Sequence, residues 1–190
     1  RRATCSCPAS RYARLRSVIS SSPRGLGCSA RARALAVQGL YGWLVGHGAI
    51  AEIEKHLSER GDEWIAEKSA EKNTESEDSD GPDFARADRD YFERLLRGVT
   101  AQVAELEPLI APLLDRTLDE LAPVERAVLL LAAWEMKQSL EIPYRVIINE
   151  AVELAKSFGG TDGHRYVNGV LDRLARELRP AEQRGPRGAG

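Results

Sequence analysis

The feature that most constrains the fold is the spacing of apolar residues between positions 29 and 180. Within each segment they recur every three or four residues, which is the period of one face of an α-helix. No segment shows the strict alternation of a half-buried β-strand. Because only short connections separate the segments, neighbouring helices are expected to pack antiparallel. The pattern therefore predicts an all-α bundle.

Apolar stripes mark the predicted helices. Ser29, Asp88, Pro108, Pro123 and Pro143 are the expected starts, because serine and aspartate cap helices and proline fits the first turn. Glycines after the first and sixth stripes and a proline after the last are the expected ends. The stripes consist of Leu35, Val37, Leu40, Tyr41 and Leu44; Ile50, Ile53 and Leu57; Tyr91, Leu95, Val99, Val103 and Leu106; Leu109, Ile110, Leu113 and Leu114; Val124, Ala127, Val128, Leu131 and Trp134; Val146, Ile147, Ala151, Leu154, Ala155 and Phe158; and Val167, Val170, Leu171, Leu174 and Leu178.

Charge is divided unevenly along the chain. The first 33 residues hold eight arginines and no acid, while the whole chain carries −2, so the remainder sums to −10. Three segments have too few apolar residues to bury a face and are expected to be disordered. They are a basic extension over residues 1–28, an acidic insertion over about residues 66–87 and a tail over residues 181–190, leaving one helical domain over residues 29–180. Because the only methionine is Met136, the extension is expected to be an over-extended or tagged start.

Several function classes do not fit the sequence. A membrane span needs about 18 apolar residues, and the longest apolar run covers only residues 127–134. Cys5, Cys7 and Cys28 all precede the helical domain, so no disulfide can hold the fold, which is typical of a reducing compartment. The cysteine and histidine spacings match no zinc site, and no nucleophile motif or phosphate-binding loop is present. We therefore expect a cytoplasmic binding protein without metal, cofactor or catalytic residues.

Two helix starts carry the residue types that bind single-stranded RNA. Arg31 and Arg33 precede Gln38 and Tyr41 on the first helix, and the last helix begins with His164, Arg165 and Tyr166. Arginine supplies charge for phosphates, an aromatic ring stacks on bases, and amides reach base edges. The alternative interpretation is that both tyrosines are core residues with their hydroxyls in water. The pattern alone leaves these two interpretations equally open.

Four separated blocks of the sequence resemble the NusB family. The first is RAR at 31–33 with AVQGLYGW at 36–43, and the second is YFERLLRGV at 91–99. The third is VERAVL at 124–129, running into WE at 134–135. The last and most specific block comprises PY at 143–144, INEA at 148–151, ELAKSFG at 153–159 and YVNGVLD at 166–172. Together the blocks run in order from about residue 30 to 180.

The resemblance implies a NusB-like helical bundle of two three-helix subdomains with one further short helix. It implies a transcription antitermination factor without catalytic activity. Such a factor binds the boxA element of ribosomal RNA leaders as a heterodimer with NusE, a small-subunit ribosomal protein. The pair then helps other Nus factors to bring RNA polymerase into a termination-resistant complex.

The resemblance also implies roles for individual residues. The RNA-binding residues implied by it are Arg31, Arg33, Gln38, Tyr41, Asp162, His164, Arg165 and Tyr166. The NusE-binding residues implied by it are Arg116, Asp119, Glu125 and Arg126. Gly169 is expected to allow close approach of a neighbouring helix, and Asn168 to cap or bridge.

The sequence departs from the family at the first helix. Ser29 and Ala30 stand where relatives carry further basic residues, which leaves a thinner basic cluster. This thinner cluster keeps one alternative open, a protein-only helical adaptor that kept the fold and lost the RNA contact. A second alternative comes from the resemblance itself, because a similar helical domain precedes ribosomal RNA cytosine methyltransferases.

Overall fold

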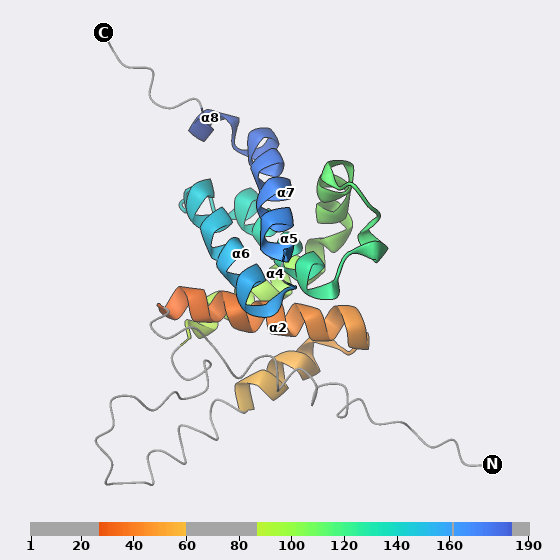
Figure 1. The fold of residues 1–190 in the computed structure, drawn as a ribbon. Helices are drawn as coiled ribbons and strands as arrows, with labels where there is room; N and C mark the ends of the chain where they lie inside the picture. Colours follow the sequence, from red (N-terminus) through yellow and green to blue (C-terminus); the bar gives the residue numbers. More distant parts are fainter. Residues whose placement is uncertain (1–26, 60–86, 161, 184–190) are drawn as a thin grey trace, which may run out of the picture.

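The computed structural model describes residues 27–59, 87–160 and 162–183, and all regular structure within these ranges is helical (Figure 1). The all-α prediction is confirmed. The basic extension and the acidic insertion, apart from their last residues, lie outside the described ranges. The helices are α2 (Cys28–Gly46), a segment over residues 50–59, α4 (Arg89–Ile110), α5 (Pro123–Gln138), α6 (Tyr144–Phe158), α7 (Gly163–Leu178) and the short α8 (Pro180–Gln183). Two 3₁₀ turns, η2 (Ala111–Leu113) and η3 (Leu118–Glu120), connect α4 to α5.

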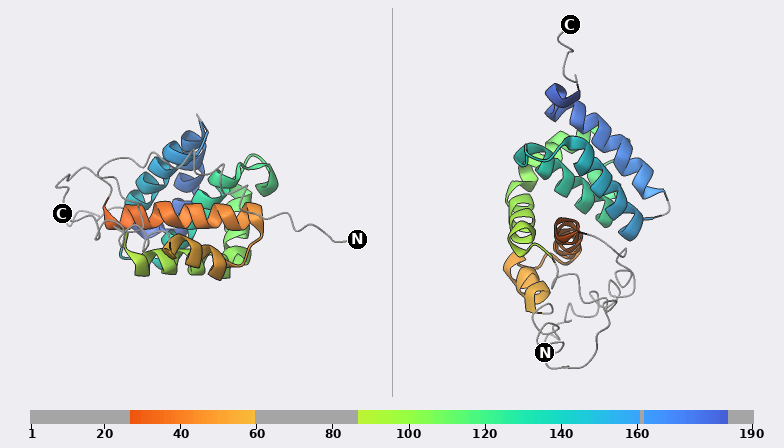
Figure 2. Two further views of the ribbon diagram at one scale, coloured as in Figure 1. Left: turned by 90° about the horizontal axis from the view of Figure 1, so that it is seen from below. Right: turned by 90° about the vertical axis from the view of Figure 1, so that its left-hand side faces the viewer.

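Helix α5 lies at the centre of the bundle. It packs against α2, α4, α6 and α7, and its residues 127–136 are all buried. A helix that is apolar on every side is stable only when it is surrounded by other elements. On one side of it lie α2, the 50–59 segment and α4, and on the other α6 and α7 (Figure 2). One continuous core joins both groups.

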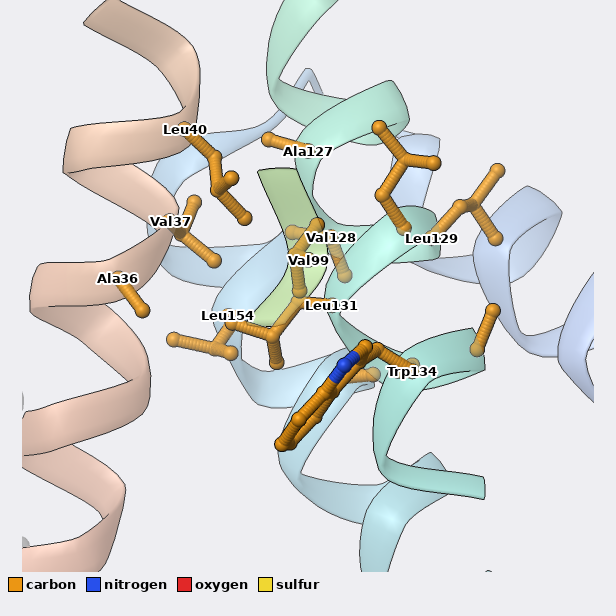
Figure 3. Packing of buried hydrophobic residues seen from close by; sticks show 14 of the residues in the cluster. Ala36, Val37, Leu40, Val99, Ala127, Val128, Leu129, Leu131, Trp134 and Leu154 are labelled. Atoms are coloured by element: carbon orange, nitrogen blue, oxygen red, sulfur yellow. The ribbon is translucent and has the colours of Figure 1, made fainter. Parts of the chain in front are cut away.

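The contact between α2 and α5 shows how closely the groups are joined. Ala36 and Val37 of α2 face Val128 and Leu131 of α5, and Leu154 of α6 completes the layer (Figure 3). Small residues on α2 let the helices approach closely. Each large apolar side chain that is buried here contributes about 1.5–3 kcal/mol to stability.

Several predicted helix boundaries are confirmed and two are wrong. Asp88 caps α4 by accepting a hydrogen bond from the Tyr91 amide at 3.0 Å, and Pro123 occupies the first turn of α5. Ser29 does not cap α2, which begins at Cys28 without a side-chain cap. Pro108 does not begin a new helix but lies inside the last turn of α4. There it removes only one backbone hydrogen bond, so the helix continues to Ile110 before the chain tightens into η2.

The C-terminal end is held to the α5–α6 corner by Arg179. Its guanidinium is buried and donates to the carbonyl oxygens of Met136 at 2.6 Å and Ser139 at 2.9 Å. It also pairs with Glu182, whose other carboxylate oxygen accepts from the Tyr144 amide at 3.0 Å. Pro180 ends α7 as predicted but begins α8, so the expected disordered tail starts too early at residue 181.

Two helical glycines differ in what surrounds them. A Cβ on Gly98 would lie 2.4 Å from the Trp134 ring, so this glycine lets α4 and α5 approach closely. Gly169 on α7 is exposed, and a Cβ there would have no neighbour within 4 Å. The prediction that Gly169 allows close helix approach is therefore wrong, and Gly98 has that role.

Candidate nucleic-acid interface

The two arginines at the start of α2 point to different sides of the helix, because a two-residue step turns a helix by about 200°. Arg31 is partly exposed, whereas Arg33 is 4% exposed. The Arg33 Nε donates to both carboxylate oxygens of Glu135, at 2.9 and 3.1 Å, and its Nη2 donates to the Tyr91 hydroxyl at 3.1 Å. A phosphate could reach this guanidinium only by breaking a buried ion pair. The expectation that Arg33 contacts RNA is therefore corrected.

Arg33, Glu135 and Tyr91 form a buried polar triad that joins α2, α5 and α4. Burial alone would lower the pKa of the Arg33 guanidinium, but the hydrogen bond and charge of Glu135 hold it above its usual value. Burial, and then the same carboxylate, raise the pKa of the Tyr91 hydroxyl. Tyr91 therefore stays protonated and donates to Glu135. Glu150 of α6 lies 3.5 Å from the Arg33 Nη1 and extends the network to a fourth helix.

Three predicted RNA residues remain accessible on α2. Arg31, Gln38 and Tyr41 are all partly exposed, and their spacing of seven and three places them near one side of the helix. The end of α6 and the start of α7 overlap α2 in Figure 1 but are set off from it in both views of Figure 2. The accessible residues of α2 and those at the start of α7 are therefore two separate groups.

The start of α7 supplies the second predicted group. Asp162 and Arg165 are exposed and form an ion pair at 3.5 Å, which contributes little to stability at such a site. His164 is partly exposed. Tyr166 packs against the core, and its buried hydroxyl interacts with the Asp115 carboxylate without reaching the geometry of a regular hydrogen bond. Of the two interpretations of these tyrosines, the core one fits Tyr166 better. Tyr41 is partly exposed and fits the RNA-binding one.

The predicted NusE residue Arg116 lies against the predicted RNA residue Tyr166. The Arg116 Cζ is 4.7 Å from the centroid of the Tyr166 ring. Asp115 accepts hydrogen bonds from the Arg116 Nε at 2.9 Å and Nη2 at 3.3 Å. The Arg116 hydrogen bond, and then the Tyr166 hydroxyl, lower the pKa of the Asp115 carboxyl to about 2. The structure thereby joins two residue groups that the sequence separated.

Glu125 and Arg126 connect the same region to the rest of the bundle. A Cβ on Gly163 would lie 2.5 Å from the Glu125 Oε1, so Glu125 lies directly beside the start of α7. Arg126 pairs with Glu107 of α4 and, at 3.4 Å, with Asp119 of η3. Its charge is therefore already balanced within the chain.

The residues that sequence reasoning missed are Glu135, Tyr91 and Asp115. Glu135 lies 102 positions from Arg33, and no local pattern announces a pairing over that distance. Both Glu135 and Tyr91 fall inside the family blocks, but the resemblance gave them no role. Asp115 lies next to Arg116 in the sequence, and this adjacent pair of opposite charges was the signal that could have identified it.

Three further findings concern the rest of the described residues. Glu153 and Lys156 form an ion pair at 2.6 Å on the solvated side of α6. Across the described ranges, no three histidine, cysteine or acidic side chains gather in a way that could hold a metal ion. None of the helices in those ranges is long and apolar enough to cross a membrane.

Comparison with known proteins gives consistent matches over most of the chain. The model of the NusB family matches residues 30–176. The transcription antitermination protein NusB of Nitrosospira multiformis is 50% identical over 150 residues, which cover 79% of this chain and 82% of the relative. The protein of the same name from Burkholderia mallei is 48% identical over 159 residues, covering 84% and 95% respectively.

Solved structures share the same fold. T. maritima NusB aligns with a TM-score of 0.59 and 24% identity, covering 84% of this chain and 99% of that one. A chain of the crystal structure of antitermination factors NusB and NusE in complex with dsRNA aligns with a TM-score of 0.55 and 23% identity, covering 78% and 96%. At these identities the likeness concerns the fold alone.

Proposed function

Because the chain belongs to the NusB family, we propose that it is a transcription antitermination factor that binds boxA RNA together with NusE. The observation that carries the proposal is the identity of about half of all aligned residues with proteins of that name. The proposed role is one of binding, with no catalytic step and no cofactor, and it implies a cytoplasmic protein. Together with other Nus factors, the complex would make RNA polymerase resistant to termination.

The accessible residues of α2 and of the start of α7 form the proposed RNA surface. Arg31 and Arg165 would contact phosphates, and the affinity would then fall steeply with salt. Gln38 and His164 can hydrogen-bond to base edges, and Tyr41 offers a ring for stacking. We assign Asp162, which is exposed, and Tyr166, which is partly exposed, to the same proposed surface. Arg33 acts indirectly, since its buried pair with Glu135 fixes the start of the helix that carries Arg31.

The proposed NusE surface lies on the η3 turn and the start of α5. Asp119 is exposed and Glu125 is partly exposed, so this region presents carboxylates to a partner. Such a surface favours a basic protein through charge complementarity. Arg126 would support the surface by holding η3 against α4 through Glu107 and Asp119. Arg116 lies at the border between the two proposed surfaces.

Titration of labelled boxA RNA with the full chain, with and without NusE, tests this proposal. The expected result is binding that strengthens when NusE is present and weakens as salt increases. An RNA of the same length and composition in scrambled order is the matched control. If no boxA RNA binds at low salt even with NusE, the proposed function is wrong for this chain.

One observation favours a second candidate, a protein-only helical adaptor. With Arg33 buried, Arg31 is the only arginine that the described start of α2 offers to an RNA. An adaptor would bind NusE but no RNA. The titration separates the two candidates, because NusE binding without RNA binding would identify the adaptor.

A further inference from the structure

The loop between η2 and η3 holds an arginine in an unusual position. Arg116 is 45% exposed, and its guanidinium carbon lies over the ring of Tyr166 at the start of α7, 4.7 Å from the ring centroid. Asp115 occupies the edge of the guanidinium with two hydrogen bonds. A planar group that is held at its edge and backed on one face keeps its other face available.

The loop that carries Arg116 is held in place by the residue that follows it, Thr117. The Thr117 hydroxyl and amide both donate to the Glu120 carboxylate, at 2.9 and 2.8 Å, which forms a capping box on η3. On the far side, Tyr166 packs against the core. The arginine is therefore positioned before any ligand arrives, which lowers the entropy lost on binding.

The charges around Arg116 favour a base over a phosphate as its ligand. Asp115 balances the guanidinium, and Glu125 is a further carboxylate that acts on it. A phosphate would have to displace Asp115 and approach these carboxylates. A nucleobase carries no charge and stacks on guanidinium planes as it does on aromatic rings.

We propose that the outer face of the Arg116 guanidinium, backed by the Tyr166 ring and clamped by Asp115, is a stacking site for one RNA base. This inference rests on the proposed RNA-binding function and makes it more specific. It moves Arg116 from the expected NusE surface to the RNA surface. It also explains how Tyr166 contributes while its hydroxyl is buried, since the ring supports the arginine from behind.

The test compares the wild-type chain with R116A, R116K and the matched control R176A. Arg176 is also an exposed arginine, on the last turn of α7, so its removal costs the same charge. The probes are boxA RNAs that each carry 2-aminopurine at one position, because stacking quenches its fluorescence. Circular dichroism melts check that all variants fold, as expected for an exposed side chain.

We expect one position to be quenched by the wild-type chain and by R176A but not by R116A or R116K. R116A should bind RNA about 5- to 150-fold more weakly, which is the effect of losing one stacked base. R116K should not restore the affinity, because an ammonium group has no plane to stack on. The slope of log affinity against log salt should be the same for R116A as for the wild type, because no phosphate contact is lost.

Four results would overturn the inference while leaving the proposed function intact. The first is equal RNA binding by R116A and R176A, and the second is RNA binding by R116K that equals the wild type. The third is tighter RNA binding by R116A than by the wild type. The fourth is an R116A variant that loses NusE binding while its binding of RNA in the absence of NusE is unchanged. The third result would mean that a base stacks directly on the Tyr166 ring and that Arg116 blocks its access. A wild-type chain that binds no RNA under any condition would overturn the proposed function and this inference together.

Discussion

Replacement of Arg33 by methionine should strongly destabilise the fold. Arg33 is 4% and Glu135 1% exposed, so the pair lies almost entirely out of water. Loss of one partner leaves a buried carboxylate unpaired, which costs about 3–5 kcal/mol. Natural domains are stable by only about 5–15 kcal/mol. In a protein of this size each kilocalorie lowers the melting temperature by about 2–4 °C, so R33M should melt roughly 6–20 °C below the wild type.

Urea unfolding followed by circular dichroism measures this loss. The control is a triple variant, R33M with Y91F and E135L, which removes all polar groups of the triad at once. Replacing a buried ionic cluster by apolar groups of similar size is often neutral, so this variant should recover most of the lost stability. A loss below about 1 kcal/mol in R33M, or a triple variant as unstable as the single one, would refute the role of the triad.

The single variant R33M also shows whether Arg33 has a structural role or contacts RNA. Each phosphate contact to single-stranded RNA contributes about 0.7 to the slope of log affinity against log salt. At a temperature where R33M is folded, its slope should equal that of the wild type. A slope reduced by about 0.7 would show that Arg33 reaches a phosphate after all.

Three further predictions follow from the described contacts. G98A should destabilise the protein by about 1–3 kcal/mol because the new methyl group meets the Trp134 ring, whereas G169A should stabilise it by up to about 1 kcal/mol, as thermal melts of the two variants would show. R179A should lose about 1.5–3 kcal/mol in urea unfolding, since the carbonyl groups at the α5–α6 corner lose a charged donor; an unchanged midpoint would exclude this role. R31A should reduce the salt slope of RNA binding by about 0.7 in equilibrium titrations, and an unchanged slope would remove Arg31 from the phosphate contacts.

The features that could be predicted from the sequence are those set by neighbouring residues. Helical periodicity identified each major helix, and the helix starts marked by the Asp88 cap and by Pro123 in the first turn depend only on the next few residues. Pro108 was misplaced because proline most often marks a helix start, whereas here α4 continues through it to Ile110. Local signals therefore located the helices well and their ends less well.

The features that could not be predicted depend on which residues meet across the fold. Arg31 and Arg33 look equivalent in the sequence, and only the position of Glu135 on α5 turns one of them inward. Gly98 and Gly169 are likewise the same residue type on regular helices, and only the Trp134 ring distinguishes them. The candidate site was thus predicted by region, while the role of each residue required the packing of the helices.

Transcription through a terminator downstream of a boxA leader tests the proposed antitermination function most directly. The assay contains RNA polymerase, NusE and the other Nus factors, with or without this chain. We predict that adding the chain increases readthrough, and that it does so only when the boxA sequence is intact. Readthrough that is unchanged by the chain, or equal on intact and scrambled boxA templates, would contradict the proposed function.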